Sequence, residues 1–249
     1  MSALALPKSS KPAIVLAVIA FAAALWSVSM QGGRNPWLAI AAFPASGFLA
    51  DLFTAMAHFG FDYVFPEDMP ILGPVAAEFR QHHQFPTLDP KDYVVNLSKG
   101  AYCCLPLAVI VFVLGFVVPQ GPAAFFVLSV LLGMSFWAFF FHQIHSYAHM
   151  GACLSPDEFK SRVALIGRLP SKKAQIQEFG KLFETVPIPP AIRFLQRCRI
   201  ILNPEIHNLH HVSFETDFSS VNGWADPVVN VILRPIAQRL KEKAQTVQV

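Results

Sequence analysis

The chain has 249 residues, of which 54% are hydrophobic and only 14% are charged. Soluble domains carry about 25% charged residues, so this composition argues against an ordinary soluble domain and favours a membrane protein. The formal net charge of +3 is small, and no basic tract is interleaved with aromatic residues, so the sequence gives no sign of nucleic-acid binding. The four cysteines form no C-x-x-C pair, which disfavours a zinc knuckle or a disulfide framework.

Four apolar blocks predict four transmembrane helices, because each approaches the roughly 20 apolar residues that a bilayer crossing requires. In chain order, the predicted spans are about 13–30, 36–56, 101–119 and 122–141. The first block exceeds the ~7–15 apolar residues of a signal-peptide core, so we interpret it as a retained span. The dipeptide QG at 120–121 makes the last two spans a tight hairpin.

Four crossings place both termini on the same side of the membrane. Of the 19 Lys and Arg residues, only Arg34 lies in the two short loops of the other side, which leaves 18 on the side of the termini. Because loops rich in Lys and Arg stay in the cytoplasm, we predict that both termini are cytoplasmic.

The predicted cytoplasmic segments are a loop over 60–100, with a short helix at PVAAEFRQHH, and a tail over 142–249. The tail shows helical stretches around 156–185, 189–202 and 226–244. We therefore predict an all-α integral membrane protein with four transmembrane helices and a cytoplasmic cap, which is the histidine-rich part of the chain. The expected organisation is a single domain over 1–249.

All nine histidines fall into four groups that this topology brings to the same membrane face. They are His58; His82 and His83; His142, His145 and His149; and His207, His210 and His211. The spacings i, i+3, i+7 and i, i+3, i+4 of the last two groups place their imidazoles on one face of a helix. Independent scatter would leave some histidines in the first or third span, the outer loops or the last 38 residues, and none lies there. Because neutral imidazole is the commonest metal ligand, this convergence predicts a metal centre.

Eight or nine imidazoles exceed the ligand number of a single ion. Two ions with four or five ligands each would keep positions open for a substrate or for dioxygen. A zinc hydrolase needs only three ligands and one open position, while imidazole also suits iron, copper and nickel. Haem in membrane proteins is held between histidines inside the spans, whereas these histidines lie at span ends and in loops. The pattern therefore favours a redox-active pair of metal ions at the membrane surface.

The segments DLFTAMAHFGFD, EFRQHH, HQIHSYAH and IHNLHH, in this order, resemble a family of membrane lipid desaturases. The family includes plasmanylethanolamine desaturase and the plant plastid palmitate trans-3 desaturase, and the likeness covers roughly 45–150 and 187–225. The resemblance implies a di-iron enzyme that uses O2 to remove two hydrogens from an alkyl chain. It implies that the iron ligands are His58, His82, His83, His142, His145, His149, His207, His210 and His211. Asp62, four residues after His58, matches an acidic position of the family and is expected to orient that imidazole.

The reaction implied by the resemblance converts a 1-alkyl (plasmanyl) ether phospholipid into its vinyl ether, a plasmalogen. The substrate would be a membrane phospholipid, and the cofactors would be two iron ions. No bound flavin or nicotinamide is expected, because the chain has no G-x-G-x-x-G fingerprint after a strand. An external electron donor of the cytochrome b5 or ferredoxin type is therefore expected as a partner.

Three alternative functions stay open. They are an acyl-lipid fatty acid desaturase that acts near the carboxyl end of the chain, a di-iron lipid hydroxylase, and a non-enzymatic metal-binding membrane protein. The segment DYVVNLSKG resembles the plant branch of the family, whereas HQIH, with His142 present, resembles the animal branch.

Two further features depart from or add to this pattern. Residues 152–187 are longer than the corresponding link of the family, and they would serve as a lid, as a docking surface for the donor or as a neutral insertion. Asp51 also matches the family, and a carboxylate near the end of a span must pair with another group or face the protein interior.

Overall fold

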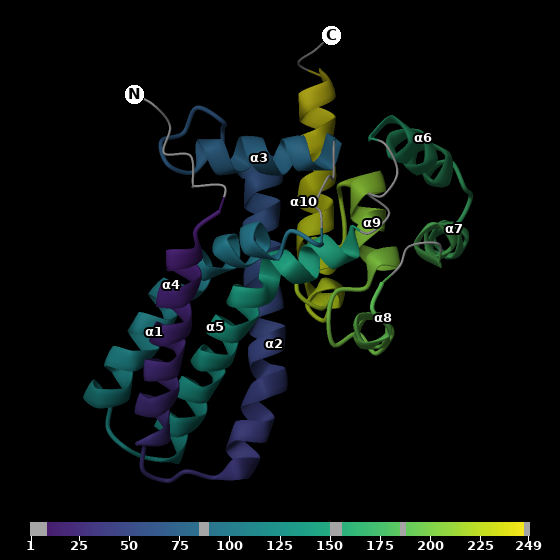
Figure 1. Cartoon of the computed structure of the whole chain (residues 1–249). Coiled ribbons are helices and arrows are strands. Elements are labelled where there is room, and N and C mark those ends of the chain that lie inside the picture. The colour runs from purple at the N-terminus through teal and green to yellow at the C-terminus, as the bar shows by residue number, and fades with distance from the viewer. Residues whose placement is uncertain (1–8, 85–89, 150–155, 185–187, 247–249) are drawn as a thin grey trace. The chain divides into compact units, whose positions relative to one another are not determined.

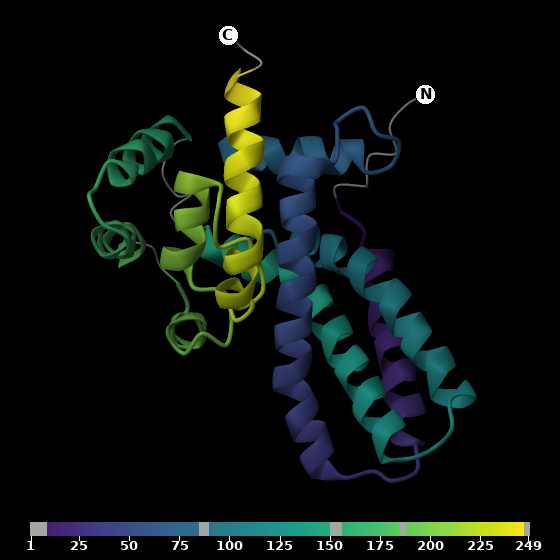
Figure 2. The same cartoon turned by 180° about the vertical axis from the view of Figure 1, so that it is seen from behind.

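The computed structural model describes residues 9–84, 90–149, 156–184 and 188–246 (Figures 1 and 2). All the regular elements among these residues are helices, which confirms the predicted all-α class. In chain order they are α1 (Lys11–Ser29), α2 (Pro36–Phe59), the π-helix η1 (Gly60–Val64), α3 (Gly73–Gln84), α4 (Tyr93–Val117), α5 (Pro122–Ala148), α6 (Pro156–Gly167), α7 (Lys172–Glu184), α8 (Pro190–Arg197), α9 (Pro204–Ser213) and α10 (Asp226–Thr246).

Four of the described helices are long and apolar enough to cross a membrane, as predicted. They are α1, α2 together with η1, α4 and α5, with 19, 29, 25 and 27 residues. A helix rises 1.5 Å per residue, so about 20 residues span the ~30 Å apolar core of a bilayer. The three longer helices therefore extend beyond the hydrocarbon region.

The extra length lies at the polar ends of the apolar blocks. α4 begins at Tyr93 rather than near 101, because the Asp92 side chain accepts a hydrogen bond from the backbone N–H of Val95 at 3.4 Å and caps the helix. α5 continues to Ala148 rather than ending near 141. Apolar content marks where a helix meets lipid, whereas capping residues decide where it begins.

The described residues group into two compact units. Among these residues, the bundle unit contains 9–50 and 90–144, and the histidine unit contains 51–84, 145–149, 156–184 and 188–246. α2 and α5 each contribute residues to both units. The sequence-based prediction of a single domain over 1–249 stays a prediction.

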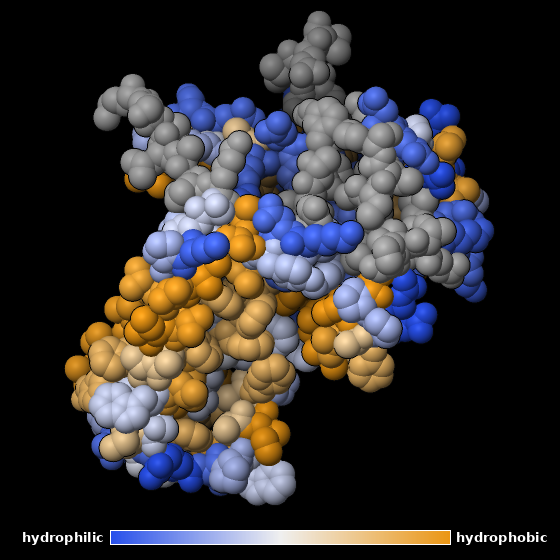
Figure 3. Space-filling view, viewed as in Figure 1, coloured by the Kyte–Doolittle hydropathy of each residue, from blue (hydrophilic) through white to orange (hydrophobic). Residues whose placement is uncertain are grey.

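Small residues allow the helices of the bundle unit to pack closely. A Cβ atom added at Gly115 of α4 would meet Ser27 of α1, one added at Gly133 of α5 would meet Ser46 of α2, and one added at Gly100 would overlap the Phe139 carbonyl oxygen. Small residues at such contacts are typical of membrane helices, where packing rather than water exclusion drives association. Figure 3 shows the apolar side chains that cover α1, α4 and α5.

The histidine unit has a core of its own between α6, α7 and α9. Phe179 is fully buried there, and it belongs to a cluster with Ile166, Tyr147 and Leu209. The described part of the 152–187 insertion forms two helices, α6 and α7, which pack against α9, and its role stays open. Figure 2 shows α10 along its length. Val229, Leu233 and Ala237 of this helix are buried.

Candidate metal centre

Helix α9 presents the three histidines of its sequence on one buried face. Its first turn is set by Asn203, whose side-chain oxygen accepts hydrogen bonds from the backbone N–H groups of Glu205 and Ile206 at 2.9 and 3.2 Å. Pro204 follows at the first helical position, where its missing N–H costs nothing. The helix starts early enough to carry all three histidines, which lie buried at His207, His210 and His211. This confirms the helical spacing predicted for IHNLHH.

Two groups of ligand atoms come together in the histidine unit. In the first group, atoms of His82, His149, His207 and His211 all lie within 4.8 Å of one another. The Nε2 atom of His149 lies 3.1 Å from that of His82 and 3.0 Å from that of His207. His145 approaches the same place, with its Nε2 2.8 Å from that of His149.

The second group combines three imidazoles with one carboxylate, His58, Asp62, His83 and His210, again within 4.8 Å of one another. The Nε2 atom of His83 lies 3.1 Å from that of His58 and 3.2 Å from that of His210. The carboxylate oxygens of Asp62 lie 3.5 Å from His58, 3.4 Å from His210 and 3.7 Å from His83. Both oxygens are buried and have no hydrogen-bond partner within the described structure.

Asp62 reaches this position because the chain remains helical beyond His58. The backbone N–H of Phe65 bonds to the carbonyl of Gly60, which is the i, i+5 pattern of a π-helix, and such turns often occur at functional sites. The orienting role that the sequence predicts for Asp62 stays a prediction. The carboxylate lies near nitrogens of three imidazoles, that of His58 included, so Asp62 is also a candidate ligand.

The hydrogen bonds of two imidazoles fix which nitrogen carries the proton. His58 donates from Nδ1 to the carbonyl oxygen of Phe218 at 2.9 Å, and His210 donates from Nδ1 to that of Thr216 at 2.8 Å. In the neutral ring the other nitrogen is then an acceptor, so both Nε2 lone pairs face the interior of the second group. His83 can donate to only one of them, and the Asp62 oxygens are also acceptors. The group therefore gathers acceptors without enough donors, and a bound cation would satisfy it.

The spacing and the protonation of the imidazoles also suit a metal ion. Two nitrogens bound to one ion at about 2.1 Å and at right angles lie ~3.0 Å apart, close to the separations in both groups. Burial, followed by the neighbouring His210 and His82, lowers the pKa of His83 from 6.5 to about 2. Burial also holds the pKa of His149, His207 and His211 well below 6.5, with neighbouring imidazoles as the second cause. At neutral pH these rings are neutral, which is the form that binds metals.

Eight of the nine predicted ligands lie in or beside these two groups, and the ninth, His142, is a member of neither. His142 precedes His145 by one helical turn and belongs to the bundle unit. Asn208, which lies between the α9 histidines, donates to the carbonyls of Ala148 and Pro204 and joins α9 to the end of α5. Sequence reasoning missed the roles of Phe218 and Thr216, because a backbone carbonyl leaves no mark in the residue type.

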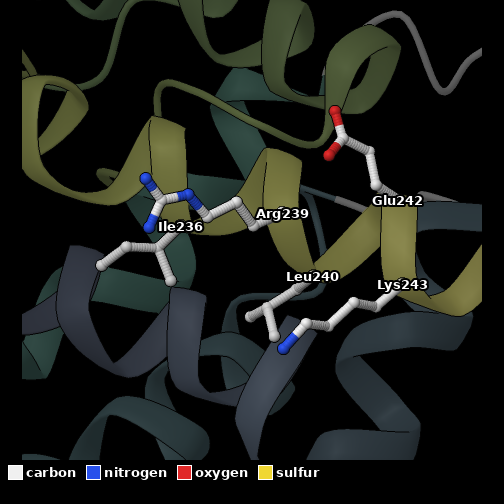
Figure 4. A pocket seen from close by; sticks show the side chains of 5 residues that line it. All are labelled: Ile236, Arg239, Leu240, Glu242 and Lys243. Carbon is white, nitrogen blue, oxygen red and sulfur yellow. The ribbon is translucent and has the colours of Figure 1, made fainter.

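A surface depression of about 450 Å³ lies along α10 and is separate from the histidines (Figure 4). Its lining side chains all come from this one helix: Ile236, Arg239, Leu240, Glu242 and Lys243. A cavity that binds a small ligand usually encloses it from several sides. This depression therefore adds nothing to the metal centre.

Four apolar helices and a buried histidine-rich metal-binding site define the class of this chain, a helical membrane protein built around a metal site. The description of the family model that matches residues 47–167 is "Lipid desaturase domain". A plasmanylethanolamine desaturase of Myxococcus xanthus is 26% identical to the chain over 221 residues, which cover 87% of this chain. The chain spans 64% of the length of that curated relative. No solved structure matches the chain. The two matches support the lipid desaturase family for this chain and confirm the resemblance of its motifs.

Proposed function

We propose that the chain is a di-iron lipid desaturase that uses dioxygen to place a double bond in a membrane lipid. The observation that carries this proposal is the pair of ligand groups in the histidine unit. The family match over 47–167 supports the desaturase class. Metal-dependent desaturation of a membrane lipid by O2 requires a redox metal ion and access to the bilayer. The chain offers residues that could hold metal ions and four apolar helices.

The two groups divide the ligands between two ions. His82, His149, His207 and His211 would hold the first ion, with His145 next to them as a fifth ligand. His58, His83, His210 and the Asp62 carboxylate would hold the second. Imidazole together with carboxylate is a ligand set that suits non-haem iron. The ligand role predicted for His142 stays open for experiment.

Bound iron would supply the reduction of dioxygen and the oxidising power that cleavage of an unactivated C–H bond requires. The chain itself does the rest. Its neutral imidazoles bind without first losing a proton, the carbonyls of Phe218 and Thr216 hold the Nδ1 protons away from the ions, and burial keeps bulk water out. The histidine unit therefore orients the ligands and provides a dry site.

The proposed substrate is a plasmanyl ether phospholipid, which the name of the bacterial relative suggests. Oxidation of the CH2–CH2 group beside the ether oxygen to a vinyl ether releases two hydrogens, and O2 with two electrons and two further protons becomes two molecules of water. The electrons would come from an external donor of the cytochrome b5 or ferredoxin type. The uneven distribution of Lys and Arg supports a cytoplasmic location for the termini and the metal site.

Lipid mass spectrometry with acid treatment tests this function. Cells that make no plasmalogens would be fed a 1-alkylglycerol and would express the intact chain, His83→Ala, or Arg162→Ala as a control on the exposed surface of α6. The intact chain and the control should produce acid-labile phospholipids two hydrogens lighter than the substrate, and His83→Ala should produce none.

The other outcomes identify the alternative functions. An acid-stable double bond in an acyl chain would indicate an acyl-lipid desaturase, and a gain of one oxygen would indicate a hydroxylase. A chain that binds metal but changes no lipid would be a metal-binding protein without this activity.

A further inference from the structure

The segment between α9 and α10, which we call the strap (Phe214–Ala225), has no regular secondary structure but touches two of the proposed ligands. Its carbonyls at Thr216 and Phe218 accept the Nδ1 protons of His210 and His58. A carbonyl can only accept, so a strap in this position selects the Nδ1–H tautomer of both rings. The conformation of the strap therefore decides whether the two Nε2 lone pairs face an ion.

The strap does not hold this conformation by local preference. Phe214 and Asp217 both have left-handed backbones, with φ of 57° and 62°. Such a conformation is unfavourable for an L-amino acid with a Cβ. Contacts from outside the strap must offset that cost.

One buried carboxylate makes the largest set of these contacts. Asp51 is 0% exposed, and its Oδ1 accepts hydrogen bonds from the backbone N–H groups of Val221 and Asn222, each at 3.0 Å. Its Oδ2 accepts from the N–H of Ala225 at 2.9 Å. An ionised carboxylate has only acceptors, so three N–H donors match it without leaving a buried charge unpaired.

The position of Asp51 on α2 connects this anchor to the metal centre. Asp51 precedes His58 by seven residues, which is about two helical turns, so both side chains leave the same face of α2. One helix thus carries a proposed ligand and the anchor of the strap that orients this ligand. The other contacts of the strap, such as Asp217 with Asn230, come from elsewhere in the histidine unit.

We propose that Asp51 is a positioning residue for the metal centre: by holding the strap, it keeps the imidazoles of His58 and His210 in the tautomer and orientation that bind the second ion. Asp51 touches neither a ligand nor the substrate in this role. The inference rests on the proposed metal site, and its test separates the two.

The affinity for Co²⁺ and the absorption spectrum of the bound Co²⁺ test the positioning role of Asp51 without a lipid substrate. The full chain would be purified in detergent, stripped with a chelator and titrated with Co²⁺, whose visible absorption reports the geometry of its ligands. Asp51→Ala should weaken Co²⁺ binding about 10–100-fold, the usual cost of losing a group that orients metal ligands, and should change the absorption. Asp51→Asn should cause an intermediate loss of Co²⁺ affinity. Its amide oxygen keeps two of the three contacts, while its NH2 group faces the N–H of Ala225.

A control separates positioning from general stability. Ile166→Ala removes a buried side chain from the core of α6, α7 and α9 and leaves the strap contacts in place. It should lower the melting temperature but keep the wild-type Co²⁺ affinity and absorption.

Either of two results would overturn the role of Asp51: wild-type affinity and absorption in the Asp51 variants, or an equal loss of affinity in Ile166→Ala. Asp51→Asn alone decides the question if Asp51→Ala does not fold. If the wild-type chain binds no Co²⁺, the proposed metal site itself is contradicted. If the wild-type chain binds Co²⁺ and Asp51→Asn binds it equally well, only the positioning role of Asp51 is contradicted.

Discussion

Replacement of Asp226 by Asn should stabilise the protein, and the gain should grow as the pH rises from 5 to 8. Asp226 begins α10, is 5% exposed and accepts a hydrogen bond from the backbone N–H of Ser219 at 3.0 Å. Burial, with help from the charges of Asp51 and Asp217, raises its pKa from 3.8 to about 7. The oxygen of Asn can accept the same hydrogen bond and never becomes charged.

The sign of this pH dependence follows from the direction of the pKa shift of Asp226. A carboxyl group whose pKa is raised by folding contributes its full stability below about pH 3.8, and this contribution is lost as the pH rises through about 7. One pKa unit corresponds to 1.36 kcal/mol, so the whole shift is worth at most about 4 kcal/mol. About 2–3 kcal/mol of this loss falls between pH 5 and pH 8.

Thermal unfolding of the wild-type protein and of Asp226→Asn in detergent, at steps between pH 5 and pH 8, measures their difference in stability. A free-energy change of 1 kcal/mol shifts the melting temperature by ~2–4 °C for a unit of about 150 residues. The advantage of Asp226→Asn should therefore grow by roughly 5–10 °C over this range. A difference between the two chains that stays constant from pH 5 to pH 8 would refute the reasoning, because titration of Asp226 could then not be its cause.

Four further predictions concern the metal centre and the bundle unit. Asp62→Asn should lower the metal content, measured by mass spectrometry, from about two ions per chain towards one, and two ions in the variant would contradict a ligand role for Asp62. His142→Ala should keep both ions, because His142 belongs to neither group, whereas a loss would identify it as a ligand. Gly100→Ala should lower the melting temperature and the yield of folded protein, because the added Cβ would overlap the Phe139 carbonyl, and an unchanged melting temperature would show that α4 and α5 can separate without cost. Chelation should lower the melting temperature and ferrous iron should restore it. An ion present at 100 times its Kd adds about 2.7 kcal/mol of stability. A melting temperature that changes with neither treatment would argue against a bound ion.

The spacing of the histidines was enough to predict most of the site. The i, i+3, i+4 pattern at His207, His210 and His211 requires only that the segment be helical, and Asn203 and Pro204 encode the start of that helix. The run PVAAEFRQHH similarly predicted α3 with its two terminal histidines. The four spans followed from apolar length, because the bilayer imposes one dimension on all of them.

The remaining features depend on contacts between distant parts of the chain. The place of Asp62 among the imidazoles depends on the π-turn of η1, and no local residue preference predicts this turn. The sequence indicated that Asp51 needs partners, because a carboxylate near the end of a span must pair or face the protein interior. It could not identify them, because the three N–H donors lie about 170 residues further along the chain. The helical spacing also favours His142 as a ligand, and this role stays a prediction, because spacing alone cannot tell which histidines of one helix face reach an ion.

α3 and α9 each supply ligands to both groups. His82 belongs to the first group and its neighbour His83 to the second, while α9 places His207 and His211 in the first and His210 in the second. A rigid helix cannot move one of these side chains into place without moving the others. Loading of the two ions in the wild-type chain should therefore be cooperative, with a Hill coefficient above one during reconstitution.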